Sequence, residues 1–440
     1  MTGRVINRYL IVTKRHACRL GATRPAERTP GETAFAPAPA NMTPHVPGPG
    51  GNPRAVRTDR QERQQHVAKR VVLHIGTMKS GTSFVQSALA RNPGVLADAG
   101  ARYLGGTFGR QTKAVLEINR SPKKIDRHVR WRALSEEARE YPGEIGVVSM
   151  EFLSFVGEHQ LAPFLDPLEG LEVEVVLTVR DQFRAIPAQW QTFTRNFGTD
   201  DWETYQRRIA ASGWRGRASQ AAKTFHRAQD VVPILERWSA PESVRRVTVV
   251  TLPPPDAPRD ELWRRFCAAA RMPAEDAGLG DLRDNVSLGY ASCDFLRRLN
   301  IHLEDVPPRS YRKAMRPLAR EILAPLRDAE GRPELDQGGV DLARHRNQEI
   351  RDAVATHGYQ LVGSLDDLPV PEETDAPDQV APPPDEQVTR AAEAVRSYAD
   401  DLVERRPRRA PTSAEADRIS LDELVGEGAR LLRKAHRWGL

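Results

Sequence analysis

A short loop rich in glycine and hydroxyl residues carries the clearest chemical signal in this chain. Gly76 and Gly81 bracket four residues, and the strand-like run before them is followed by a helical pattern after them. Backbone N–H groups at the start of a helix point at a bound anion, and a lysine nearby adds positive charge. The loop residues that could contact an anion are Lys79, Ser80, Gly81, Thr82 and Ser83. These residue types predict a phosphate-binding site.

The position of the lysine separates this loop from the P-loop of nucleoside triphosphatases. That motif places a lysine directly after the second glycine, where it reaches the β- and γ-phosphates. Here Thr82 occupies that position, and Lys79 lies inside the loop. A triphosphate site would therefore lack its usual cation. A ligand with one 5′-phosphate that carries a transferable group could use a cation closer in.

The segment Lys79–Ser83, led by His74-Ile75-Gly76, resembles the 5′-phosphosulfate loop of sulfotransferases that use 3′-phosphoadenosine 5′-phosphosulfate (PAPS). The lead-in is similar to that of bacterial members of the family. The resemblance implies that the loop N–H groups and the hydroxyls of Thr82 and Ser83 hold the 5′-phosphate. It also implies that Lys79 offsets the charge that develops on the bridging oxygen as the S–O bond breaks.

A cation after a later strand is the second part of this resemblance. Family members carry an arginine there and a serine eight residues on, and both bind the 3′-phosphate of the cofactor. Arg180 follows the strand-like run Val173–Val179 and could present two N–H groups to phosphate oxygens. Ala188 stands where the serine would be, and Thr192 lies one turn further on as a substitute. The alternative role for Arg180 is a surface ion pair, for instance with Asp181.

The candidate general base is Glu151, which directly follows the strand-like run Ile145–Met150. Several carbohydrate sulfotransferases have a glutamate after this strand and use it to deprotonate the acceptor hydroxyl. The alternative is a glutamate at a helix start that is stabilised by the helix dipole. Other candidate bases are His74, His128, His159 and His226.

Two further residues are candidates for binding the 3′-phosphate. Asn285 and Ser287 belong to a segment that resembles the Asn-x-Ser-Leu stretch towards the end of bacterial sulfotransferase-like domains. In the family this region approaches the 3′-phosphate. Ser287 could equally cap the helix predicted from Ser287 to His302.

The elements that must position these residues alternate between strands and helices. Short apolar, β-branched runs are typical of buried parallel strands. They lie at Val71–Ile75, Ile145–Met150, Val173–Val179 and Val247–Leu252, with a last extended segment at Gly358–Val362. Helical patterns between them include Arg184–Arg195, Trp202–Ser212 and Val231–Ser239. The alternation predicts a three-layer α/β fold, like the core of P-loop kinases, with a central parallel sheet and helices on both faces.

Composition divides the chain into four parts. Residues 1–69 are rich in proline and glycine and are expected to form a disordered basic extension. We expect a sulfotransferase domain over residues 70–368, a Pro-rich linker over 369–387 and a charged helical tail over 388–440. The tail is expected to be solvated, with docking on the body or on a protein partner as alternatives. On these boundaries, residues 68–368 alone should fold and bind cofactor.

The overall composition limits the classes of partner. The cysteines Cys18, Cys267 and Cys293 are far apart, so no disulfide framework or zinc site is expected, and a cytoplasmic location follows. No apolar run is long enough to predict a membrane span. The net charge of +6 sits largely in the Arg-rich ends, so no nucleic-acid partner is expected.

Together these observations predict transfer of a sulfuryl group from PAPS to a hydroxyl or amine, without a metal. The acceptor is a small molecule or a glycan, with carbohydrates, lipids and secondary metabolites all open. One alternative is a small-molecule kinase that uses ATP, which would require a lysine at position 82 and a magnesium carboxylate. The other is a nucleotide-binding protein that has lost catalysis, an idea that Ala188 favours.

Overall fold

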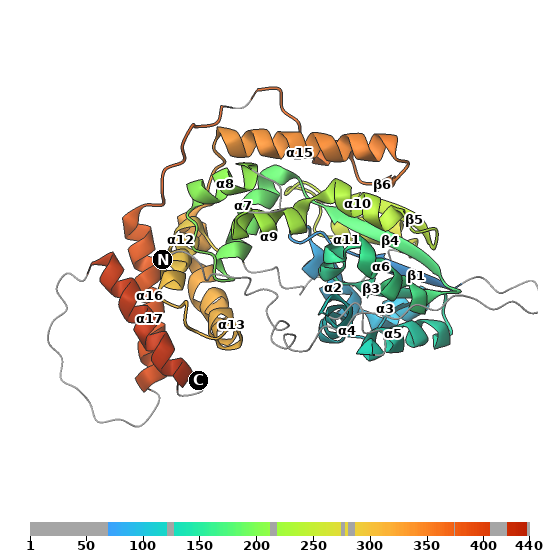
Figure 1. Ribbon diagram of the computed structural model, residues 1–440, viewed down its shortest axis with the longest axis horizontal. Coiled ribbons are helices and arrows are strands. Elements are labelled where there is room, and N and C mark those ends of the chain that lie inside the picture. The colour runs from blue at the N-terminus through green and yellow to red at the C-terminus, as the bar shows by residue number, and fades with distance from the viewer. Residues whose placement is uncertain are drawn as a thin grey trace, which may run out of the picture. The chain divides into compact units, whose positions relative to one another are not determined.

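A computed structural model describes most of the chain after residue 68 (Figure 1). The described residues are 69–120, 127–211, 218–273, 278–279, 287–373, 375–404 and 420–437. The extension predicted over residues 1–69 lies outside them except for Lys69, and Asn285 also lies outside them.

A six-stranded sheet forms the centre of the described residues, and all of its strands are parallel. The strand order is β2-β3-β1-β4-β5-β6. The strands are β1 (Arg70–His74), β2 (Ala101–Tyr103), β3 (Ile145–Ser149), β4 (Glu172–Val179), β5 (Val244–Thr251) and β6 (Gln360–Val362). The four β-branched runs and the last extended segment therefore correspond to strands, as predicted. The short edge strand β2 was not predicted.

Helices connect the strands and cover the sheet (Figure 1). The first group is α2 (Thr82–Arg91), α3 (Pro93–Asp98), α4 (Phe108–Arg120), α5 (Val129–Glu140), α6 (Glu158–Leu165), α7 (Gln182–Thr194), α8 (Trp202–Ala211) and α9 (Gln220–Gln229). The second is α10 (Val231–Ser239), α11 (Glu261–Ala270), α12 (Tyr290–Ile301), α13 (Pro308–Pro317), α14 (Arg327–Glu330), α15 (Gln337–Thr356), α16 (Asp385–Glu404) and α17 (Leu421–Arg437). Short 3₁₀ segments are η3 (Glu151–Phe155), η4 (Asp166–Leu168), η6 (Ala324–Leu326) and η7 (Leu365–Asp367), and η5 (Leu318–Leu323) is a π-helical segment.

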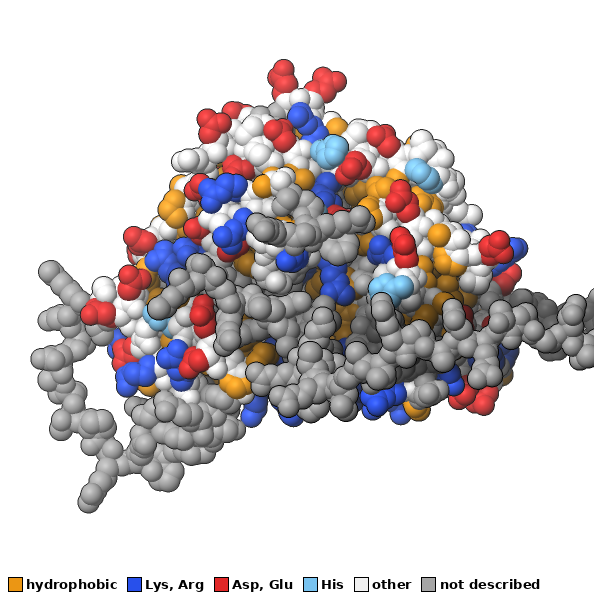
Figure 2. Space-filling model, viewed as in Figure 1, with side chains coloured by type: hydrophobic (Ala, Val, Ile, Leu, Met, Phe, Trp, Pro, Cys, Tyr) orange, Lys and Arg blue, Asp and Glu red, His pale blue; other side chains and the backbone are white. Residues whose placement is uncertain are grey.

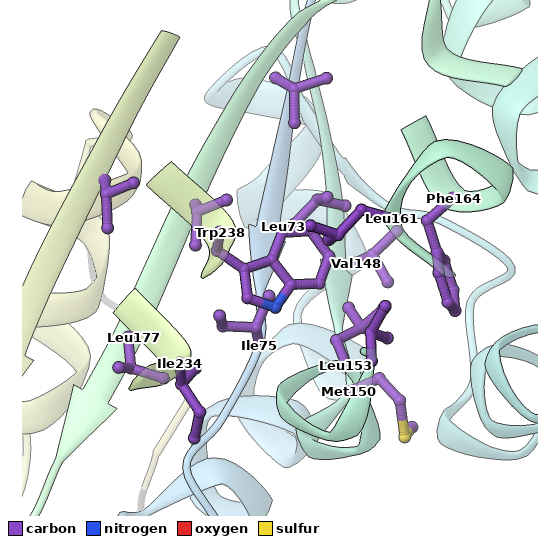
Figure 3. Close-up of a cluster of buried hydrophobic side chains, with 14 of the residues drawn as sticks. Leu73, Ile75, Val148, Met150, Leu153, Leu161, Phe164, Leu177, Ile234 and Trp238 are labelled. Atoms are coloured by element: carbon purple, nitrogen blue, oxygen red, sulfur yellow. The ribbon is translucent and has the colours of Figure 1, made fainter. Parts of the chain in front are cut away.

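Both faces of the central strands are buried, which explains the apolar runs within β1, β3, β4 and β5. On one face Leu73 and Ile75 pack with Trp238 of α10 and Phe164 of α6 (Figure 3). On the other face Val72 belongs to a separate cluster with side chains of α2 and α11. Successive strand residues alternate between faces, so one strand serves both clusters. The result is a helix–sheet–helix arrangement.

A third cluster consists of helices that lie beyond the sheet. Trp190 of α7 is fully buried there, with its ring centroid 5.3 Å from that of Trp202 and 5.7 Å from that of Tyr290. Trp190 is thus a packing residue. Because the cluster joins α7 to α12 and α13, it fixes the segment that follows Arg180.

The C-terminal helices belong to this third cluster. Val388, Ala391 and Val395 of α16 are fully buried, and α16 and α17 lie side by side next to α12 (Figure 1). The expectation of a solvated tail is therefore wrong for the described part of it. The apolar face of α16 was easy to miss because small alanines make up much of it. The boundary at residue 368 stays a prediction, and the burial of α16 disfavours it.

Removing residues 369–440 is expected to destabilise the fold, because it uncovers the surface against which α16 packs. Each buried valine contributes about 1.5–3 kcal/mol through removal from water. A protein of residues 68–368 should therefore unfold at a lower urea concentration than one of residues 68–440. Equal unfolding midpoints would contradict this account of the tail.

Candidate active site

The loop between β1 and α2, residues 75–81, is held in place by the neighbouring strand β4. The Thr77 N–H donates to the Thr178 carbonyl at 2.9 Å, and the Thr178 N–H donates to the Gly76 carbonyl at 2.7 Å. The Ser80 hydroxyl donates to the Thr77 carbonyl at 2.6 Å and lies 2.7 Å from the Thr178 hydroxyl. The buried Ser80 side chain therefore shapes the loop, which leaves the backbone of Ser80 as its possible contact with an anion.

The start of α2 is arranged to receive an anion. Lys79 and Gly81 both have positive φ, at 65° and 79°, and Gly81 is the N-cap of the helix without a side-chain cap hydrogen bond. The first N–H groups of a helix have no partner within it. The Thr82 and Ser83 hydroxyls form no hydrogen bond with another described residue, in contrast to that of Ser80. These groups remain available to a phosphate, as the sequence predicts.

Lys79 lies among other cations. Its pKa is lowered to about 8, first by burial and then by the charges of Arg195 and Arg180, while Cys293 and Glu151 oppose the change. Positive charges this close together favour an anionic ligand, because a bound anion would raise the Lys79 pKa towards its usual value. Arg195 was not singled out from the sequence. It directly follows α7, and only the fold brings it near Lys79.

Arg180 lies at the carboxyl end of β4, beside the β1–α2 loop. Its Nη1 is 3.4 Å from the Lys79 carbonyl, and its buried Nε has no partner among the described residues. Burial, and then the charge of Arg184, lower the pKa of Arg180 to about 10; Asp181 opposes the change, and Arg332 adds to it.

The alternative of an Arg180–Asp181 ion pair is not what the structure contains. The Asp181 carboxylate pairs with Arg184 at 2.5 Å and accepts the Phe183 N–H at 2.8 Å, which caps α7. Among the described residues, no carboxylate therefore pairs with the Arg180 guanidinium.

The serine expected eight residues after Arg180 is Ala188, and Thr192 does not simply replace it. The Thr192 hydroxyl donates to the Ala188 carbonyl at 3.1 Å, within α7. It could still accept a hydrogen bond, but its proton is engaged in the helix. Binding of a 3′-phosphate here would therefore depend mainly on arginine.

Glu151 follows β3 and opens the 3₁₀ segment η3. Gln86 of α2 donates to the Glu151 carboxylate at 2.8 Å and to the Ser149 carbonyl at 3.2 Å. A Cβ atom at Gly76 would lie 3.4 Å from the Glu151 Cα, so the loop passes close to this residue. The charge of Glu151 also acts on Lys79. The two residues predicted to be catalytic therefore lie on the same edge of the sheet.

Tyr103 lies near this glutamate. Its hydroxyl is buried and has no hydrogen-bond partner among the described residues. Burial, and then the charge of Glu151, raise the pKa of Tyr103. The phenol therefore stays neutral and able to donate a hydrogen bond.

Two of the four histidines named as candidate bases, His74 and His226, have other partners. His74 Nδ1 lies 2.7 Å from the Ser149 hydroxyl and Nε2 lies 3.1 Å from the Thr178 hydroxyl, and burial lowers the His74 pKa to about 3. His226 has both ring nitrogens engaged, by Asp230 and by the Ile209 carbonyl. These two histidines support the fold rather than offer a free base.

Ser287, the other candidate for binding the 3′-phosphate, lies just before α12. Its hydroxyl lies 3.3 Å from Arg327 Nη1, and Gly289 rather than Ser287 is the N-cap of α12. The capping role considered for Ser287 is therefore wrong. Its predicted partner Asn285 lies outside the described residues.

The described residues also bear on other kinds of site. No group of three or more His, Cys, Asp or Glu side chains is arranged to hold a metal ion. None of the described helices is long and apolar enough to cross a membrane. Two surface cavities lie away from Lys79, one between α5 and α6 and one at the amino-terminal ends of β4 and β5.

No model of a protein family matches this chain, and no curated protein or solved structure matches it either. The functional argument consequently depends on the residues of the site.

Gly81→Ala is expected to destabilise the protein by about 1–2 kcal/mol, because its φ is costly for a residue with a Cβ atom. The added Cβ would also lie 2.4 Å from Leu262 Cδ2, so that side chain would have to move. Urea unfolding measures the effect. Gly94→Ala is the matched control, because a Cβ there meets no atom within 4 Å. Equal effects of the two substitutions would contradict this account of the loop.

Lys79 should make anion binding depend on pH, since its pKa is about 8. Affinity for adenosine 3′,5′-bisphosphate should fall as the pH rises above about 8, because the free lysine loses its proton. Binding near that pH should take up a proton, which calorimetry in buffers of different ionisation enthalpy measures. Lys79→Arg should abolish the uptake, because arginine stays protonated. The same uptake in this variant would show that another group titrates.

Proposed function

We propose that this chain is a PAPS-dependent sulfotransferase built on a P-loop-like fold. The observation that carries the proposal is the position of Lys79, inside the loop rather than after it, with Arg180 on the adjacent strand end. A cation inside the loop suits a single 5′-phosphate with one transferable group. It does not suit the β- and γ-phosphates of a triphosphate.

In the proposed reaction Glu151 takes the proton of an acceptor hydroxyl, and the acceptor oxygen forms a bond to sulfur. The S–O bond to the 5′-phosphate breaks, and adenosine 3′,5′-bisphosphate leaves. Lys79 stabilises the negative charge that collects on the phosphate oxygen. The hydrogen bond from Gln86 orients the Glu151 carboxylate, so that the base is positioned before the acceptor binds.

The remaining residues of the site would hold the two phosphates. The N–H groups of residues 79–83 and the hydroxyls of Thr82 and Ser83 would bind the 5′-phosphate. Arg180 would bind the 3′-phosphate, and Asn285 and Ser287 are retained from the sequence as further candidates. The Arg184 and Arg332 charges act on Arg180, which supports a dianion at this end of the site. No metal is required by this scheme.

Two alternatives are kept because specific residues favour them. A kinase that uses ATP would share the strand–loop–helix arrangement, but Thr82 stands where its lysine is required. A nucleotide-binding protein without catalysis is favoured by Ala188 and by the engagement of the Thr192 hydroxyl within α7.

Calorimetric titration with adenosine 3′,5′-bisphosphate, AMP and ATP–magnesium separates these functions. We expect the bisphosphate to bind most tightly, and Lys79→Ala to weaken it by on the order of tenfold, equivalent to about 1.4 kcal/mol. Lys113→Ala, at an exposed lysine of α4, is the control and should leave binding unchanged.

Tight binding of ATP–magnesium without binding of the bisphosphate would overturn the proposal in favour of the kinase. Binding of the bisphosphate without release of product from PAPS, across a broad panel of acceptors, would favour the silent nucleotide-binding protein.

A further inference from the structure

Three glutamine side chains are buried next to the β1–α2 loop. They are Gln182 and Gln189 of α7 and Gln229, the last residue of α9, and their exposed fractions are 0%, 2% and 1%. Figure 2 shows charges of both signs interspersed on one face of the protein, whereas these uncharged amides lie inside it. Burial of a polar side chain is unfavourable unless its hydrogen bonds are formed, and an apolar side chain would fill the same space without that cost. What these amides bind is therefore informative.

Two of the glutamines bind the same carbonyl of the loop. Gln229 Nε2 donates to the Met78 carbonyl at 2.7 Å, and Gln189 Nε2 donates to it at 3.4 Å. In a trans peptide the C=O and N–H groups point in opposite directions. Because the Met78 carbonyl points at α7 and α9, the Lys79 N–H points away from these helices. No described residue accepts a hydrogen bond from the Lys79 N–H.

The other carbonyls of this part of the loop are engaged in the same way. Each carbonyl from Ile75 to Lys79 accepts a hydrogen bond from a described residue. In chain order, the donors are the Ser154 N–H, Thr178, the Ser80 hydroxyl, the two glutamines and Arg180. The carbonyl oxygens, which would repel an anion, are thus directed at donors of the protein.

Gln229 is itself held through its backbone and through its side chain. Its backbone carbonyl accepts a hydrogen bond from Arg346 of α15 at 3.1 Å, and Arg346 also pairs with Asp230 at 2.7 Å. On the side-chain amide, Oε1 accepts a hydrogen bond from Gln182 Nε2 at 3.4 Å. Gln182 Nε2 also donates to the Arg180 carbonyl at 3.2 Å. A network connected in this way restricts the directions in which the Gln229 amide can point.

We propose that Gln229 is a positioning residue of the site, which holds the Met78 carbonyl and thereby directs the Lys79 N–H at the 5′-phosphate. Gln189 supports the same carbonyl through its longer hydrogen bond. The inference rests on the proposed function and deepens it, because it names residues that act on the nucleotide without touching it.

A positioning role and a role in packing alone differ in their effect on the two phosphates. Without the Gln229 amide the Met78–Lys79 peptide can rotate, which weakens the contact with a 5′-phosphate. The proposed contact of Arg180 with the 3′-phosphate does not depend on that peptide. A packing role would instead affect both phosphates alike, because it would act through the stability of the whole fold.

NMR spectroscopy of the full chain labelled with ¹⁵N-lysine follows the Lys79 N–H directly. The chain has nine lysines, so the spectrum is simple, and the Lys79 signal is the one that Lys79→Arg removes. AMP, which has only a 5′-phosphate, should shift this signal downfield as the N–H donates to a charged oxygen, and adenosine should not.

Gln229→Met should weaken AMP binding by on the order of tenfold and reduce the downfield shift at saturation, since a hydrogen bond to a charged group is lost. Adenosine 3′-monophosphate should bind the variant and the unchanged protein equally. Gln189→Met removes the longer hydrogen bond and is the second variant, should Gln229→Met fail to fold. It should weaken AMP binding by a smaller factor and also leave adenosine 3′-monophosphate unaffected.

Gln206→Met is the matched control. Gln206 of α8 is 1% exposed, and its amide accepts the Asp336 N–H at 3.0 Å, a contact that does not involve the loop. This variant should bind both monophosphates as the unchanged protein does. Urea unfolding of the three variants shows which of them are folded.

An unchanged AMP affinity and Lys79 shift in Gln229→Met would overturn the inference, as would a Lys79 signal in the unchanged protein that AMP does not move. Equal weakening of AMP and adenosine 3′-monophosphate would also overturn it, in favour of packing. Turnover of PAPS tests the proposed function separately. If AMP shifts the Lys79 signal through Gln229 but PAPS yields no product with any acceptor, the sulfotransferase is overturned and the role of Gln229 stands.

Discussion

Pairing of Thr178 with the β1–α2 loop is the interaction on which the candidate site depends. Its backbone exchanges hydrogen bonds with Gly76 and Thr77, and its hydroxyl donates to the Gly76 carbonyl and contacts Ser80. His74, which burial keeps neutral, also belongs to this network, because its Nε2 lies 3.1 Å from the Thr178 hydroxyl. A satisfied buried network of this kind is rigid. It allows Lys79 and Gly81 to keep their left-handed backbone and holds the start of α2 open to an anion.

The same strand order determines the electrostatics. Because β1 lies between β3 and β4, Glu151, the β1–α2 loop and Arg180 follow three adjacent strand ends. Arg180 and Arg195, which lie before and after α7, then act on Lys79 with positive charge, and an anionic ligand would offset part of the cost. A positively charged site beside one oriented carboxylate would suit the sulfuryl transfer that we propose.

Much of the site could be predicted because it depends on local pattern and strand order. The β-branched runs indicated strands buried on both faces, and the residues directly after them were therefore expected on one edge. Arg195 could not be found this way, because its approach to Lys79 depends on how α7 packs. The strand β2 is too short to show a pattern. Docking of α16 was missed because its buried side is formed largely of alanines within a charged sequence.

A crystal structure with adenosine 3′,5′-bisphosphate tests the central claim most directly. The account predicts the 5′-phosphate within hydrogen-bond distance of the N–H groups of residues 79–83, with Lys79 Nζ beside it, and the 3′-phosphate on the Arg180 guanidinium. A nucleotide bound elsewhere, or one whose 5′-phosphate does not contact the β1–α2 loop, would contradict the proposed role of the loop and with it the sulfotransferase assignment.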